Sequence, residues 1–186
     1  AQAGAFSGEE AALKAREQLQ GKGYPAKIFR GEDSFNLYVA LGATKADMEA
    51  LGERLERSGL DIYLKKVETK PLTFGQKGDL EKIEPLPDFL SASGQLMEQL
   101  LESSAMFLKG EGLKEQELRS LKELHRQVLL EGQKVINVLD GQVGQHGEDM
   151  MRELTVALSA LEAYVHKPHS AYVWEVRQAG LKYLAL

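Results

Sequence analysis

Two similar units follow each other in the first seventy residues, and this repeat limits the folds that the N-terminal part can adopt. Each unit carries apolar residues at i, i+3 and i+7, the spacing of one face of a helix. These residues are Ala12, Ala15 and Leu19 in the first unit and Met48, Leu51 and Leu55 in the second. Gly23 and Gly59 follow the two sets. Because glycine accepts the left-handed conformation that ends many helices, we expect a helix before each of them.

Both expected helices also have a start signal. Ser7 with Glu10, and Thr44 with Asp47, have the spacing of an N-terminal capping box. In such a box the hydroxyl at the first position accepts a hydrogen bond from a backbone N–H of the first turn. The sequence therefore predicts that Ser7 and Thr44 cap the two helices.

Stretches of alternating apolar and polar residues surround the helices and have the period of half-buried strands. They are the opening at 1–6, YPAKIF at 24–29, FNLYVALG at 35–42 and LDIYLKKV at 60–67. The polar turn RGEDS at 30–34 separates the middle two. The order β-α-β-β-α-β predicts an α+β domain: a four-stranded antiparallel sheet with two helices on one face.

The two helices can cover only one face of such a sheet, so the other face should be open. Leu37, Val39 and Leu41 alternate with Tyr38 and Ala40, and we expect the first set to meet the helices. In the first strand Ala1, Ala3 and Ala5 should point the same way. The residues expected on the open face are Gln2, Gly4, Phe6, Lys27, Phe29, Tyr38, Ala40, Tyr63 and Lys65.

The order of these features resembles a known family. The chain has a Q-x-G-x-F opening, two helices that each end at a glycine, and a strand that leads into a further glycine. The residues concerned are Gln2, Gly4, Phe6, Gly23, Gly42 and Gly59. Together they resemble the SPOR domain over residues 1–68, and the helical second half suggests the stage II sporulation protein B group. The family often has Gly-Pro-Phe where this chain has Gly42-Ala43-Thr44, and an arginine on the strand that here carries Tyr38 and Ala40.

The resemblance implies a function. SPOR domains are extracytoplasmic modules that bind septal peptidoglycan strands from which the stem peptides have been removed, usually across the open face of the sheet. It implies a non-catalytic module that targets a bacterial division or sporulation protein to the septum. Because the chain opens directly on a strand-like stretch, we expect a preceding segment upstream, with any membrane anchor.

Five residues of the expected open face are candidate glycan contacts: Gln2, Phe29, Tyr38, Tyr63 and Lys65. A glutamine amide both donates and accepts hydrogen bonds, and tyrosine adds a flat apolar ring with a hydroxyl. Both suit an uncharged polymer of sugar rings, and the first seventy residues carry equal numbers of acidic and basic side chains. The alternative is that these are ordinary solvent-facing strand residues.

The second half of the chain has a different organisation. Residues 69–88 hold three of the five prolines and predict a linker or crossover, part of which packs. Residues 89–186 predict a bundle of four helices joined by short links, over 88–109, 113–139, 147–166 and 170–185. The second helix has a seam at 118, 121, 125, 128, 132, 135 and 139 that includes His125 and Gly132. Gly132 marks either a close helix crossing or a solvent-facing position. We expect His125 to be a hydrogen-bonded packing residue.

Composition and motifs weigh against other classes of function. The formal net charge of −5 argues against a dedicated nucleic-acid binder, although this β-α-β-β-α-β order is shared with RNA-recognition folds. No apolar run approaches the length of a membrane span. With no cysteine, no P-loop and no G-x-S-x-G, we expect no enzyme activity, no cofactor and no metal. The remaining alternative is a protein–protein scaffold, in which the helical half binds another division or sporulation protein and the sheet is passive.

Overall fold

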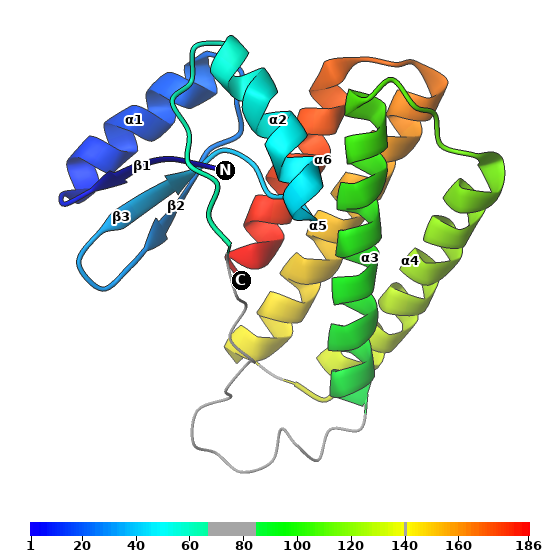
Figure 1. Ribbon diagram of the computed structural model, residues 1–186. Coiled ribbons are helices and arrows are strands. Elements are labelled where there is room, and N and C mark those ends of the chain that lie inside the picture. Colours follow the sequence, from blue (N-terminus) through cyan, green and yellow to red (C-terminus); the bar gives the residue numbers. More distant parts are fainter. Residues whose placement is uncertain (67–84, 140) are drawn as a thin grey trace.

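The computed structural model describes residues 1–66, 85–139 and 141–186 of the chain. A small sheet with two helices lies beside a group of four longer helices (Figure 1). The expected linker at 69–88 falls mostly outside the described residues, and the helix that follows it already begins at Pro85. None of the helices in the described ranges is both long and apolar enough to cross a membrane.

The two helices of the repeat form as predicted, as α1 (Glu9–Gly21) and α2 (Lys45–Arg57). Gly23 and Gly59 follow them with φ of 83° and 80°, the left-handed conformation expected at a helix stop. The hydroxyl of Thr44 caps α2 by accepting from the Asp47 N–H at 3.1 Å. The predicted Ser7 cap is wrong, because the N-cap of α1 is the next residue, a glycine that makes no side-chain bond.

Within the described residues the sheet has three strands rather than the predicted four: β1 (Gln2–Phe6), β2 (Lys27–Arg30) and β3 (Phe35–Tyr38), in the antiparallel order β1-β3-β2. As far as the structure describes it, the expected fourth strand pairs with β1 only at Gln2 and Tyr63, through two backbone hydrogen bonds of 2.8 Å. The register of β1 shifts between Gln2 and Gly4. Such an irregularity disrupts the ladder beside it, and this explains why the pairing does not extend toward Asp61.

Because of this register shift, the side chains of β1 that follow Gln2 point to the faces opposite to those predicted. Gln2 lies opposite Tyr38 as predicted, but Gly4 lies opposite Leu37, which faces the helices. Phe6 therefore packs against the helix-side core, and Ala5 is exposed. The predicted placement of Gly4 and Phe6 on the open face is wrong, because strict alternation does not continue through a register shift. A Cβ at Gly4 would lie 2.8 Å from the Phe6 ring, so any larger residue here requires that ring to shift.

The core of this part lies between the sheet and the helices α1 and α2. Leu37 and Val39 are fully buried there with Leu51 and Leu55 of α2, as the alternation predicted. Ile62 joins the same cluster from the segment that follows α2. The helices thus cover one face of the sheet and leave the face with Gln2 and Tyr63 uncovered by them.

The helical half contains α3 (Pro85–Leu108), α4 (Glu115–Ile136), α5 (Gly141–His166) and α6 (Ser170–Leu184). Figure 1 shows them packed side by side in a bundle, as predicted. The seam of α4 faces inward, and Gly132 is buried at a crossing with Phe89 and Met151. His125 is partly buried and makes a hydrogen bond of 2.8 Å to the Thr155 hydroxyl.

A buried ion pair joins the two halves. Arg177 on α6 donates from Nη1 and Nη2 to the two carboxylate oxygens of Asp47, at 2.7 and 2.8 Å. Nη1 also donates to the Leu41 carbonyl at 2.7 Å. The two side chains are 0% and 4% exposed. The second half is therefore docked on the N-terminus of α2, which the sequence did not predict.

Candidate functional site

The sheet face turned away from α1 and α2 brings together the five candidate residues. Strand pairing places Gln2 directly opposite both Tyr38 and Tyr63. Directly paired residues share a face of the sheet. The rings of Phe29 and Tyr38 touch edge to face, with their centroids 5.2 Å apart. Lys65 follows Tyr63 by two residues and lines one pocket with Phe29 and Tyr38. We call this surface the outer face.

An amide network lies at the centre of the outer face. Nε2 of Gln2 donates to the Asn36 side-chain oxygen at 3.1 Å and to the Gly4 carbonyl at 3.2 Å. The amide nitrogen of Asn36 in turn donates to the Ser34 hydroxyl at 3.1 Å. These bonds hold the two amides in fixed orientations, which lowers the entropy cost of binding a polar ligand.

Asn36 was not among the predicted site residues. It lies two residues before Tyr38 on the same strand, so the alternation that placed Tyr38 also predicts the position of Asn36. It faces Phe29 across the β2–β3 pair. The partly buried amides of Gln2 and Asn36 thus sit between the Phe29–Tyr38 ring pair and the polar turn.

The outer face is less open than predicted at one end. Tyr38 is 8% exposed and Ala40 is 1% exposed, whereas Tyr63 is 67% exposed. The expectation that Tyr38 and Ala40 lie on an open surface is wrong, because Tyr38 packs edge to face against Phe29 and Ala40 belongs to the buried core cluster. A ligand can therefore reach Tyr63 freely, but it reaches Tyr38 only through the pocket beside it.

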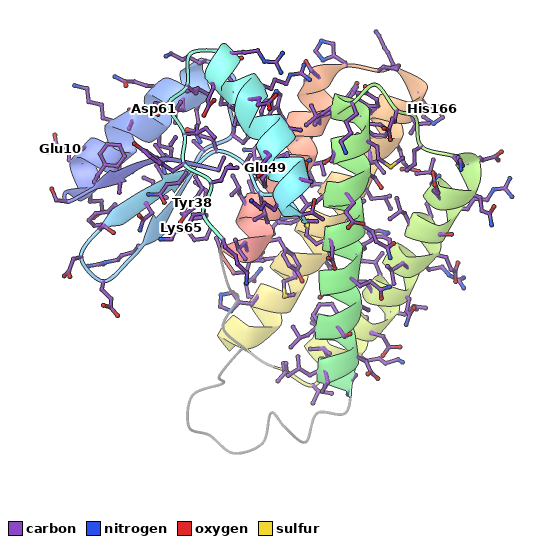
Figure 2. All side chains as sticks on the ribbon, viewed as in Figure 1. Glu10, Tyr38, Glu49, Asp61, Lys65 and His166 are labelled. Atoms are coloured by element: carbon purple, nitrogen blue, oxygen red, sulfur yellow. The ribbon has the colours of Figure 1, made fainter. Side chains whose placement is uncertain are left out.

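That pocket has a volume of about 780 Å³ and lies where the sheet meets α6. Phe29, Tyr38 and Ala40 line it from the sheet, and Leu181 and Leu184 line it from α6. The segments 41–45 and 64–66, together with Ala1 and Met48, complete the lining. Figure 2 labels Tyr38 and Lys65, which both belong to this lining. The contribution of α6 could not be predicted, since it comes from the other half of the chain.

Comparison with protein families gives a match to the part of the chain that carries the outer face. Residues 1–66 match the family model described as SPOR domain. These residues are a SPOR domain. No curated protein and no solved structure matched the chain. SPOR domains are peptidoglycan-binding modules of cell-division proteins in the bacterial envelope.

The SPOR match covers all five predicted site residues and both helices of the repeat. It ends at residue 66, so it does not extend to the four helices of the second half. The match therefore lies on the sheet half, and α6 of the helical half meets that half at the pocket.

Proposed function

We propose that the SPOR domain of this protein binds peptidoglycan glycan strands whose stem peptides have been removed, without catalysing a reaction on them. The observation that carries the proposal is the combination of fixed amides with the exposed Tyr63 ring and the Phe29–Tyr38 ring pair on the outer face of a SPOR domain. By this binding, the protein is directed to the septum of the dividing or sporulating cell. The proposal places it outside the cytoplasm and takes residues 1–68 as the targeting module.

The chemistry of the outer face suits a glycan strand. N-acetylated sugars present amide and hydroxyl groups along the edges of the ring and C–H groups on its faces. The Gln2 and Asn36 amides offer complementary hydrogen bonds, while the Tyr63 and Phe29 rings offer apolar surface to the C–H groups. The first seventy residues carry equal numbers of acidic and basic side chains, which suits an uncharged polymer as the partner.

Cosedimentation with sacculi tests this proposal. The full chain should sediment with amidase-treated sacculi and remain largely in the supernatant with untreated sacculi, whose stem peptides crowd the glycan. Equal sedimentation with both preparations would contradict recognition of denuded strands. If the protein stays in the supernatant with both, binding itself is refuted, and the alternative of a passive sheet beside a protein-binding helical half becomes the better account.

Variants of the outer face should weaken this binding. Gln2→Ala removes one or two ligand hydrogen bonds of about 0.5–1.5 kcal/mol each, so retention should fall several-fold. Tyr63→Ala should have a similar effect, and because Tyr63 is exposed it should leave the fold intact. Tyr38 is buried, so for this residue Tyr38→Phe is the better test, because it removes only the hydroxyl group and keeps the packed ring. Gln18→Ala on the exposed side of α1 is the matched control and should bind like the parent. Unchanged retention of both Gln2→Ala and Tyr63→Ala would place the site elsewhere.

A further inference from the structure

The described lining of the pocket between the sheet and α6 combines basic side chains with apolar ones. Lys45, Lys65 and Lys66 belong to its lining, which contains no acidic residue among the described positions. The chain as a whole has more acidic than basic residues, 28 against 23. Amines around a largely apolar pocket favour a ligand that combines an anionic group with apolar surface.

Resting on the function proposed above, we infer that this pocket is a subsite for the muramic acid unit of a denuded strand. In intact peptidoglycan the lactyl carboxyl group of this sugar is joined to the stem peptide as a neutral amide. Hydrolysis of that amide by an amidase leaves a free carboxylate on the sugar. An amine that binds the carboxylate would therefore distinguish a denuded strand from an intact one.

In this subsite the amine of Lys65 binds the lactyl carboxylate. Lys65 is exposed, it lies on the outer face two residues after Tyr63, and it lines the pocket with Tyr38. The amine of Lys45 is already 3.2 Å from Glu49, one turn further along α2. The Phe29–Tyr38 ring pair provides the apolar surface against which the sugar or its lactyl methyl group would pack.

The helical half supplies one wall of this subsite. Leu181 is 2% exposed, and Leu184 lies on the last turn of α6 at the pocket. Both follow Arg177, whose ion pair with Asp47 holds α6 against the loop 41–45 that also lines the pocket. The subsite is therefore composite, and the helices contribute to glycan recognition as well as to the fold.

Calorimetric titration of the full chain with three tetrasaccharides tests the inference. The first alternates N-acetylglucosamine with N-acetylmuramic acid, called muramic acid here for short, and has free lactyl carboxylates. The second is the same compound with these carboxylates converted to methylamides, and the third contains only N-acetylglucosamine. The parent should bind the first about tenfold more tightly than the second, as expected for a hydrogen bond to a charged group. This preference should shrink as salt is added.

Two variants separate the parts of the inference. Lys65→Gln should lose the preference for the free carboxylate and still bind the methylamide, whereas Lys14→Gln on the exposed side of α1 should keep the preference. Leu184→Ala should weaken binding of both muramic acid compounds several-fold, whereas Leu130→Ala on the exposed face of α4 should not.

The inference is overturned if the parent binds the first two compounds equally, if Lys65→Gln keeps the preference, or if Leu184→Ala binds like the parent. In each of these cases the proposed function survives as long as the parent binds the tetrasaccharides. Failure of the parent to bind any of the three would instead refute the proposed function itself.

Discussion

Replacing Arg177 by alanine should lower the free energy of unfolding by about 3–5 kcal/mol. The change removes the partner of a carboxylate that is only 4% exposed and leaves Asp47 charged inside the protein. It also deprives the Leu41 carbonyl of its donor. Urea denaturation, followed by far-ultraviolet circular dichroism, measures the loss.

Arg119→Ala on α4 is the matched control for this prediction. Arg119 also pairs with a carboxylate, Glu115, but both side chains are exposed, so the loss should be about 0–1 kcal/mol. The double variant Arg177→Met with Asp47→Leu removes both charges and should recover much of the stability of the parent. If Arg177→Ala is no less stable than Arg119→Ala, the buried ion pair does not hold the two halves together.

Gly132→Leu should lower the free energy of unfolding by about 1–3 kcal/mol through overpacking. A Cβ at this position would lie 2.8 Å from Cε2 of Phe89 and in close contact with the Met151 sulfur. A leucine must therefore displace the Phe89 and Met151 side chains that fill the crossing. Thermal melting monitored at 222 nm reports the effect.

Gly94→Leu on α3 controls for the change of residue type. A Cβ at Gly94 would meet nothing within 4 Å, so leucine should fit there and even add helix propensity of up to about 1 kcal/mol. The two variants should differ in the sign of their effect. Melting of Gly132→Leu at the temperature of the parent would mean that the α4 seam does not pack as described.

The local elements of the fold could be predicted because their signals are local. The repeated stripe, the left-handed glycines and the Thr44 cap all act within a few residues, and they placed α1 and α2 correctly. The number of strands could not be predicted, because the register shift in β1 changes no residue pattern. Alternation alone therefore suggested a fourth strand and placed Phe6 on the wrong face.

The residues that share the outer face could be predicted from the sequence, whereas the segments that pack around them could not. Alternation brought Gln2, Tyr38 and Tyr63 to one face, and it would also have placed Asn36 there. The burial of Tyr38 and the wall formed by α6 depend on contacts between distant segments. Arg177 and Asp47 are 130 residues apart, and nothing in the sequence near either residue indicates the other.

The most direct test of the account is a titration of the ¹⁵N-labelled full chain with a denuded glycan tetrasaccharide, followed by amide chemical shifts. The account predicts that the largest shift changes fall on Gln2, Asn36, Tyr63 and Lys65 of the outer face. The exposed side of α1, represented by Lys14 and Gln18, should remain unchanged. Shift changes confined to the helices, or none at ligand concentrations that saturate binding to sacculi, would contradict glycan recognition by the outer face.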